Sequence, residues 1–221
     1  MSATRIYCLS GLGADFRIFR QLQLPGYQLV PVEWLAIQKA ETLPQYASRL
    51  AAQINEQEPL ILGVSFGGML ATELAALLPH SRAFIVSSCK CRAELPAWMR
   101  LAGRLQLHRV VPYQLAPRHA GLGRFIFDTR STEEERYLKQ IMLQQTHPHF
   151  IARAVHMILH WQRRQAPANV FHVHGRTDRL LLPGRCQPHH WIDDGGHFMI
   201  WNKAASISQL LMQALDARTA E

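Results

Sequence analysis

Short apolar segments recur along the chain, each bounded by Gly, Pro or polar residues at the spacing expected for β-strands. Most are continuous apolar runs rather than alternating ones, a pattern typical of strands that are covered on both faces of a sheet. Six of these segments are predicted to be strands. They span residues 5–9, 27–32, 60–64, 83–87, 169–174 and 189–192.

Helical patterns lie between several of these strands. Residues 66–78 form a compact apolar helix that Pro79 ends, and residues 42–57 form an amphipathic one. The amphipathic segment places five apolar side chains on one face: Leu43, Tyr46, Ala47, Leu50 and Ile54. Because strand, helix and strand follow one another, the sequence predicts an α/β fold with a mostly parallel sheet and right-handed crossovers.

The alternation stops between residues 90 and 165, where no segment has the pattern of a strand. Helices are expected there at 95–107, 133–145 and 150–164. We therefore interpret residues 90–165 as a helical cap or lid, inserted into a core made of residues 1–89 and 166–221. No internal repeat or low-complexity tract suggests a further domain.

The composition is that of a folded protein without a membrane span. Of the 221 residues, 48% are hydrophobic and 18% are charged, which argues against intrinsic disorder. Every apolar run stops short of the roughly 18 to 20 residues that a spanning helix needs. The apolar stretch near the N-terminus is too short for a signal-peptide core, so a cytoplasmic location is expected. The four cysteines form no paired motif and are expected to be reduced structural thiols.

The net charge of +8 resides in the predicted cap. Residues 90–165 hold 13 Lys or Arg and 5 Asp or Glu, whereas the rest of the chain holds 11 of each. A solvated helical surface is one interpretation of this charge. The other is a surface that steers an anionic substrate, an acyl carrier or a lipid surface toward the protein. No nucleic-acid-binding motif accompanies the charge, so nucleic acid is not an expected partner.

Candidate chemistry centres on the motif Gly63-Val64-Ser65-Phe66-Gly67, between the predicted strand at 60–64 and the helix at 66–78. A serine on so sharp a turn needs a strained backbone, and glycines two residues away on either side avoid a collision across the turn. Gly63 and Gly67 meet that need. The turn raises the Ser65 hydroxyl above the sheet and places the Phe66 N–H where it can stabilise an oxyanion.

A serine nucleophile needs a base, and the base needs an acid that orients it. Asp178 lies four residues beyond the predicted strand at 169–174, and His197 lies just past the last predicted strand. Asp193 and Asp194 are alternative acids, but adjacent carboxylates at a strand end usually face solvent. The pair Asp178 and His197 is therefore favoured.

A metal site is not expected. His172 and His174 alternate along a strand and share a face, as two metal ligands could, but no third ligand is evident near them. No zinc-binding motif accompanies the twelve histidines. No organic cofactor is implied either.

The sequence resembles the α/β-hydrolase superfamily over nearly its whole length. Three segments carry the resemblance: the turn at residues 63–68, His174-Gly175-Arg176-Thr177-Asp178, and Gly195-Gly196-His197-Phe198. The resemblance implies Ser65 as nucleophile, Asp178 as orienting acid and His197 as general base, in the chain order of that fold. It also implies that the family's leading antiparallel hairpin is missing here, which leaves about six core strands.

The same resemblance locates a second oxyanion donor in the loop after the first strand, at residues 9–15. Many relatives carry His-Gly there, whereas this chain has Ser10-Gly11. The Leu12 N–H is the expected donor, because glycines at 11 and 13 let the backbone approach a substrate closely. Asp15 is expected to cap the helix that follows.

These features predict a serine hydrolase that cleaves a small-molecule carboxylic ester or thioester through an acyl-enzyme intermediate. Two other functions stay open. One is an acyl-carrier-protein ester hydrolase whose basic cap grips an acidic carrier, and the other is a slow or non-catalytic ligand-binding protein on the same fold. Carbon–carbon bond hydrolysis, acyl transfer and cofactor-free peroxidation use the same three residues, so the sequence does not separate them. It does not predict the oligomeric state.

Overall fold

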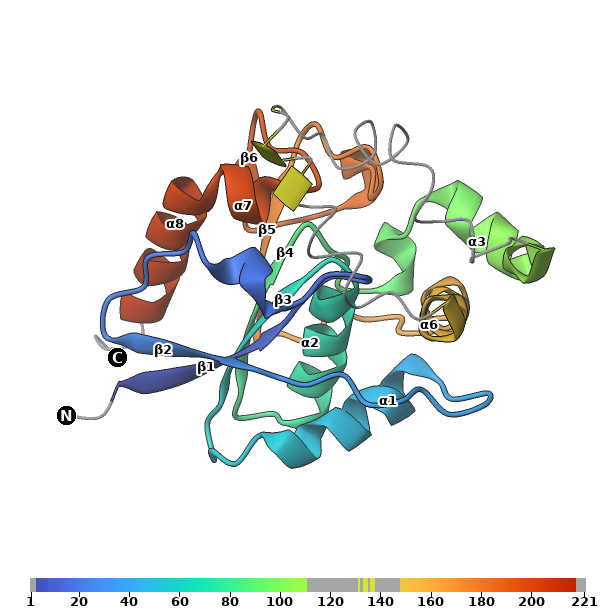
Figure 1. Cartoon of the computed structure of the whole chain (residues 1–221), viewed down its shortest axis with the longest axis horizontal. Coiled ribbons are helices and arrows are strands. Elements are labelled where there is room, and N and C mark those ends of the chain that lie inside the picture. Colours follow the sequence, from blue (N-terminus) through green and yellow to red (C-terminus); the bar gives the residue numbers. More distant parts are fainter. Residues whose placement is uncertain (1–2, 111–130, 132, 135, 138–147, 218–221) are drawn as a thin grey trace.

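The computed structural model describes residues 3–110, 131, 133–134, 136–137 and 148–217. Within them, one sheet of six strands has the order β2-β1-β3-β4-β5-β6, and every neighbouring pair is parallel (Figure 1). The strands are β1 (Thr4–Leu9), β2 (Tyr27–Pro31), β3 (Leu60–Val64), β4 (Arg82–Val86), β5 (Val170–Gly175) and β6 (His190–Ile192). The predicted α/β fold with about six mostly parallel strands is confirmed.

Burial along the strands follows their position in the sheet. The four inner strands, β1, β3, β4 and β5, are buried along most of their length, as continuous apolar sequences predict. The edge strands β2 and β6 are partly exposed. The strand β3 thus lies inside the sheet between β1 and β4, and the chain that leaves its carboxyl end is enclosed by both neighbours.

Helices cover both faces of the sheet (Figure 1). The helices α1 (Leu43–Leu50) and α2 (Phe66–Leu77) pack on one face, where their apolar side chains share a buried cluster with β1, β3 and β4. The other face is covered by the 3-10 turn η1 (Phe16–Phe19) and the C-terminal helices α7 (Met199–Asn202) and α8 (Ala204–Asp216). As predicted, the Asp15 side chain caps η1 by accepting the Arg17 N–H at 2.9 Å.

The C-terminal helix α8 is absent from the predicted elements, although its sequence carries a signal. Ile207, Leu211 and Leu215 recur at helical spacing, and all three are buried against the sheet. Gln209 and Gln213, which lie between them, are exposed, as in an amphipathic helix of a globular protein. The helical spacing of these apolar residues is the sequence signal that indicates the helix.

The helix predicted at 42–57 is shorter in the structure. A capping box at Thr42 and Gln45 begins α1, but the helix ends at Leu50 and continues only as the 3-10 turn η2 (Ala51–Gln53). Ile54 therefore lies beyond the helix, in an extended backbone conformation (φ −107°, ψ 111°), and packs against the buried cluster from there. A β-branched residue favours this extended geometry.

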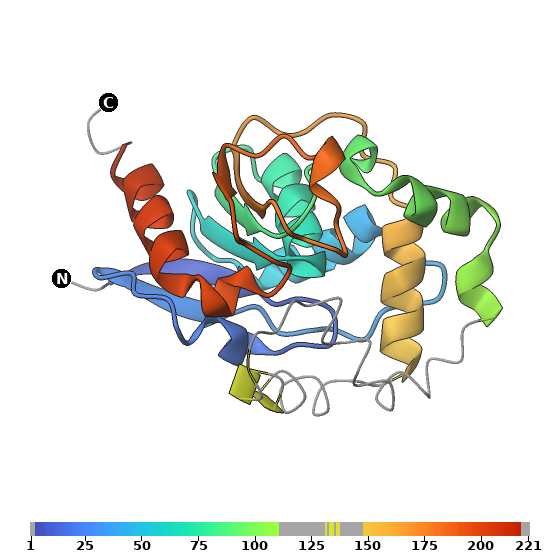
Figure 2. The same cartoon turned by 90° about the horizontal axis from the view of Figure 1, so that it is seen from above.

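The helices predicted between residues 90 and 165 are only partly as expected. The segment predicted at 95–107 contains α3 (Ala97–Arg104) and then the 3-10 turn η4 (Leu107–Val110), because Gln106 has a φ of 54° and interrupts the helix. Most of the helix predicted at 133–145 lies outside the described residues. The last helix is α6 (Pro148–Leu159) rather than 150–164, and α3, η4 and α6 lie beside one another at one end of the molecule (Figure 2).

A buried carboxylate explains why α6 ends before residue 164. Glu73 of α2 is 3% exposed and accepts hydrogen bonds from Trp161 Nε1 and, at 2.8 and 2.6 Å, from Arg163 Nε and Nη2. A buried charge is tolerated only when it is paired and hydrogen-bonded. The chain leaves the helix after Leu159, which brings both partners onto Glu73.

These contacts tie the end of the predicted cap to α2. The division into a core of residues 1–89 and 166–221 and a cap of residues 90–165 stays a prediction.

Among the described helices, none is both long enough and apolar enough to cross a bilayer.

Candidate active site

Ser65 lies at the sharp turn between β3 and α2, and its backbone is held from both sides. Its φ of 53° and ψ of −118° are unfavourable for a residue with a side chain, as the sequence predicts. The Ser65 N–H donates to the Val86 carbonyl at 3.1 Å, while its own carbonyl accepts the Gly68 and Met69 N–H groups and the Ser88 hydroxyl at 2.7 Å. Strain of this kind persists only where neighbouring contacts fix it.

The two glycines of the motif are required by different neighbours. A Cβ at Gly63 would lie 2.4 Å from the Gly67 carbonyl oxygen, which is the collision across the turn that the sequence predicts. A Cβ at Gly67 would instead lie 2.2 Å from the carbonyl oxygens of Leu9 and Ser10, at the end of β1. Glycine is therefore required at position 67 by the neighbouring strand β1 rather than by the turn itself.

The structure brings Ser65, His197 and Asp178 together at the carboxyl ends of β3, β5 and β6. His197 Nε2 lies 2.9 Å from Ser65 Oγ, and His197 Nδ1 lies 2.8 Å from Asp178 Oδ2. Since a carboxylate oxygen accepts, Nδ1 carries the proton and Nε2 can accept the hydroxyl hydrogen of Ser65. Asp178 and His197 are 2% and 4% exposed, so this chain of hydrogen bonds is shielded from water.

The Asp178 carboxylate is held by its own loop. Oδ1 accepts the N–H groups of Leu180 and Leu181, both at 2.9 Å. Burial alone would raise the pKa of Asp178, but the charge and hydrogen bond of His197, the nearby His174 and the Leu181 N–H outweigh it and lower this pKa. The carboxylate is therefore ionised at neutral pH, where it can orient His197 and stabilise its cationic form.

The other two candidate acids lie at the surface. The side chains of Asp193 and Asp194 are 90% and 61% exposed, and they pair with Arg176 and Lys203 respectively. Asp178 is the carboxylate whose oxygen reaches His197 Nδ1. The preference for Asp178 over its two alternatives agrees with this geometry.

The two histidines that alternate along β5, His172 and His174, lie behind Asp178 and hydrogen-bond to each other. His174 Nε2 lies 3.7 Å from Asp178 Oδ2 and donates to the Leu181 carbonyl at 2.8 Å. His172 Nε2 then donates to His174 Nδ1 at 3.2 Å. The two rings therefore support the loop that carries Asp178. The sequence showed that both share one strand face but not that this face lies behind Asp178.

Phe66 and the loop that carries Leu12 lie beside Ser65. Phe66 is the first residue of α2, where N–H groups have no partner within the helix. The loop that carries Leu12 passes close to the serine, since a Cβ added at Gly11 would lie 3.6 Å from Ser65 Cβ. Gly13, with a φ of 77°, allows the turn. The roles of the Phe66 and Leu12 amides stay a prediction.

The chain matches one known protein family and is similar in fold to solved structures. Residues 5–215 match the family described as "Alpha/beta hydrolase family". The structure is similar to the enol-lactonase from Burkholderia xenovorans LB400, with 12% sequence identity, a TM-score of 0.73, and 98% of this chain and 92% of that chain covered.

Two further solved structures have comparable likeness. A thermophilic esterase from Thermogutta terrifontis has 16% identity and a TM-score of 0.67, with 98% of this chain and 90% of that chain covered. The thioesterase domain from the curacin biosynthetic pathway has 16% identity and a TM-score of 0.61, with 96% and 92% covered. At such identities the likeness concerns the fold alone. No curated protein matches the sequence.

Replacing Gly67 tests how tightly the serine turn is built. Gly67→Ala should lower the free energy of unfolding by about 1 to 3 kcal/mol, because its Cβ must displace backbone at the end of β1. Gly184→Ala is the matched control, since a Cβ there meets nothing within 4 Å. Denaturant unfolding followed by circular dichroism measures both variants. Equal stability of Gly67→Ala and the wild-type protein would contradict the described packing.

Acid should destabilise the protein through His172. Burial, followed by the nearby His174, Lys90 and His189, lowers the pKa of this imidazole well below its ordinary value. The unfolded chain therefore binds a proton that the folded chain does not, and stability falls as the pH drops below about 6.5, by up to about 1.4 kcal/mol per pH unit. His172→Gln keeps an N–H donor for His174 but does not titrate, so its stability should fall less steeply.

The measurement is denaturant unfolding of the wild-type protein and His172→Gln at intervals between about pH 5 and about pH 7. His80→Gln, at an exposed histidine, should keep the slope of the wild-type protein. Identical slopes for the wild-type protein and His172→Gln would show that the buried imidazole does not resist protonation.

Proposed function

The chain belongs to the alpha/beta hydrolase family, and from that premise we propose that it is a serine hydrolase that cleaves a carboxylic ester or thioester through an acyl-enzyme intermediate. The observation that carries the proposal is the chain of hydrogen bonds from Ser65 Oγ through His197 to Asp178. A serine hydroxyl within 2.9 Å of an imidazole nitrogen, with a buried carboxylate on the other nitrogen, has the arrangement of an activated nucleophile.

In the proposed reaction, Ser65 Oγ attacks the substrate carbonyl carbon while His197 Nε2 takes the hydroxyl proton. Asp178 keeps the Nδ1 proton in place and offsets the positive charge that the ring gains. His197 then protonates the leaving alcohol or thiol, and the acyl group stays on Ser65. In the second half, His197 removes a proton from water, which attacks the acyl-enzyme and releases the acid.

The oxyanion of each tetrahedral intermediate is proposed to accept hydrogen bonds from the Phe66 and Leu12 N–H groups. The start of α2 supports this role, because the dipole of its twelve residues adds positive potential at Phe66. The close passage of the 10–14 loop beside Ser65 supports the second donor. Donors that are fixed before the reaction stabilise the developing charge without reorganisation.

An apolar cavity supports a substrate with an apolar acyl or alcohol group. The ring of Trp34 stacks on that of Phe66, next to Ser65, with centroids 5.6 Å apart. Trp34 also lines a cavity of about 420 Å³ together with Leu35, Ile37 and Phe150. Ala36, His149 and Arg153 complete its lining, which is mainly apolar. This volume matches that of small-ligand sites. The esterase and thioesterase among the similar structures agree with an ester or thioester as substrate.

The charge of residues 90–165 favours a second candidate, the hydrolysis of an ester carried on an acidic acyl carrier protein. Five arginines of the described part of this segment are exposed: Arg104, Arg109, Arg136, Arg153 and Arg164. Of its three described acidic residues, Glu94 is buried and pairs with Lys90, Glu134 is partly exposed and Glu133 is exposed. The exposed surface is therefore rich in positive charge, which can steer an anionic partner.

Loss of the Ser65 hydroxyl tests the main proposal. Ser65→Ala should lower kcat for a small activated ester by about four to six orders of magnitude, because no other group then forms the acyl-enzyme. Ser206→Ala, at an exposed serine of α8, is the matched control and should keep wild-type turnover. Steady-state kinetics with both variants give the result. Undiminished hydrolysis by Ser65→Ala would overturn the assignment, and no hydrolysis by the wild-type protein would favour the ligand-binding alternative.

Salt dependence tests the second candidate. Raising NaCl from about 0.05 M to about 0.5 M shortens the range of charge interactions, so it should lower kcat/KM several-fold for an ester linked to acyl carrier protein. A small neutral ester serves as the control, since its hydrolysis should change little. Equal salt dependence for the two substrates would contradict the proposal that the basic surface binds an acyl carrier protein.

A further inference from the structure

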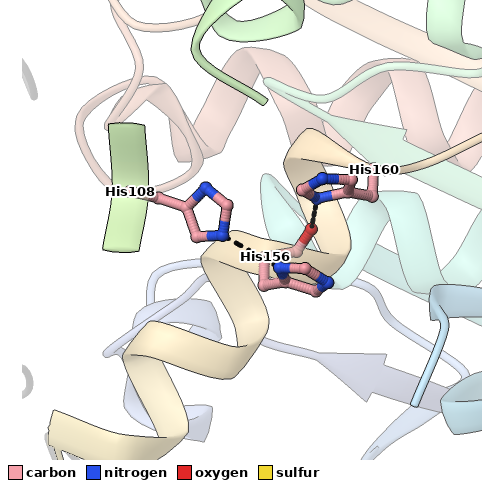
Figure 3. A group of neighbouring side chains, drawn as sticks. All are labelled: His108, His156 and His160. Atoms are coloured by element: carbon pink, nitrogen blue, oxygen red, sulfur yellow. Dashed lines mark hydrogen bonds between the residues drawn. The ribbon is translucent and has the colours of Figure 1, made fainter. Parts of the chain in front are cut away.

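Three histidines that take no part in the proposed hydrolysis come together in the segment of residues 90–165. His156 lies on α6, His160 follows the last residue of that helix, four positions further along, and His108 approaches both from η4 (Figure 3). A nitrogen of each ring lies within 4.8 Å of a nitrogen of the other two. The sequence motifs do not predict this cluster, because His108 and His156 are 48 positions apart along the chain.

The rings already contact one another closely. His108 Nε2 and His156 Nδ1 are 2.9 Å apart, so one nitrogen donates a proton and the other offers a lone pair. The rings of His156 and His160 stack with centroids 4.1 Å apart. His108 is 6% exposed, and its Nδ1 is buried without a hydrogen-bond partner among the described residues. The three rings therefore hold more nitrogen lone pairs and N–H groups than they can pair with one another in hydrogen bonds.

The third histidine is oriented as metal ligands commonly are. His160 Nδ1 lies 2.9 Å from the His156 carbonyl oxygen (Figure 3). A carbonyl only accepts, so Nδ1 carries the proton and, in the neutral ring, Nε2 keeps a lone pair. Histidines that bind metals usually donate their other N–H to a carbonyl or carboxylate in this way.

The spacing of the three residues suits a transition-metal ion. Two histidines at positions i and i+4 of a helix present both rings on one face, as they do in known zinc motifs. With Zn–N bonds of about 2.1 Å, the ligand nitrogens of a tetrahedral site lie about 3.4 Å apart. Here one pair is 2.9 Å apart and all three lie within 4.8 Å. The observed spacings therefore bracket the separation that a bound zinc ion needs.

A cavity beside the three histidines leaves room for a fourth ligand. His108 and His156 line a cavity of about 490 Å³, with Lys39, Arg109 and Arg153 also along its walls. Glu41, the carboxylate among the lining residues, is paired with Arg49 at 3.0 Å. The basic walls favour water, hydroxide or another small anion as the fourth ligand over a protein carboxylate.

We propose that His108, His156 and His160 bind one divalent transition-metal ion, with Zn²⁺ as the best fit, and with water or a small anion as fourth ligand. Imidazole nitrogens suit Zn²⁺, Cu²⁺ and Ni²⁺ and are poor ligands for Mg²⁺ and Ca²⁺. The ion joins η4 to α6, so its binding energy adds to the stability of this part of the fold. The site is independent of the proposed hydrolysis, because it shares no residue with Ser65, His197 or Asp178.

Zinc binding by the full chain, purified with any histidine tag removed, tests the proposal. Titration with Zn²⁺ against a colorimetric chelator should show one tight site per chain, and Zn²⁺ should raise the melting temperature. His108→Ala, His156→Ala and His160→Ala should each weaken binding by about 10-fold or more and abolish the shift in melting temperature. His80→Ala, at an exposed histidine, should leave both readouts unchanged. Circular dichroism of each variant separates lost binding from lost folding.

The ligand type distinguishes this cluster from a second buried group. Cys89, Glu94 and Cys186 also hold candidate ligand atoms within 4.8 Å of one another. Co²⁺ bound to the histidines should give visible absorption bands without the near-ultraviolet charge-transfer band of a thiolate ligand. Binding that survives all three histidine substitutions, or that disappears in Cys89→Ser and Cys186→Ser instead, would overturn the proposal. So would the absence of any zinc binding by the wild-type protein.

Discussion

The rest of the structure depends on the forced backbone turn at Ser65. A φ of 53° puts the serine in a conformation that its own side chain opposes. Its N–H donates to the Val86 carbonyl, and its carbonyl accepts from Ser88 and the first turn of α2, which holds it there. The end of β1 approaches so closely that Gly67 has no room for a Cβ. This packing leaves the Ser65 hydroxyl at the carboxyl edge of the sheet and the first N–H groups of α2 beside it.

Parallel strands then collect the other residues at the same edge. Asp178 follows β5 and His197 follows β6, and both side chains lie near Ser65, which follows β3. Behind Asp178 lies a layer of buried polar side chains. His174 supports the Asp178 loop, and the neighbouring Cys89 and His174 outweigh burial and lower the pKa of Cys186. The site is thus backed by polar groups that come from the loop after β4, from β5 and from the loop before β6.

The sequence predicts local features well and long-range contacts poorly. The strands are found within a residue because continuous apolar runs and their Gly or Pro boundaries are local signals. Ser65, Asp178 and His197 were selected from a motif and from their places after strands. By contrast, the Glu73 contacts with Trp161 and Arg163, the position of His174 and the meeting of His108 with α6 depend on tertiary packing. No periodicity encodes such contacts, which is also why the end of α6 was predicted wrongly.

The central claim is that the environment of Ser65 makes its hydroxyl an activated nucleophile. The most direct measurement is reaction of the folded protein with a fluorophosphonate, followed by mass spectrometry of its peptides. The account predicts a single phosphonyl adduct, on Ser65, which forms far more slowly in the His197→Ala protein. An unmodified Ser65 after prolonged exposure, or an adduct on another serine with Ser65 intact, would contradict it.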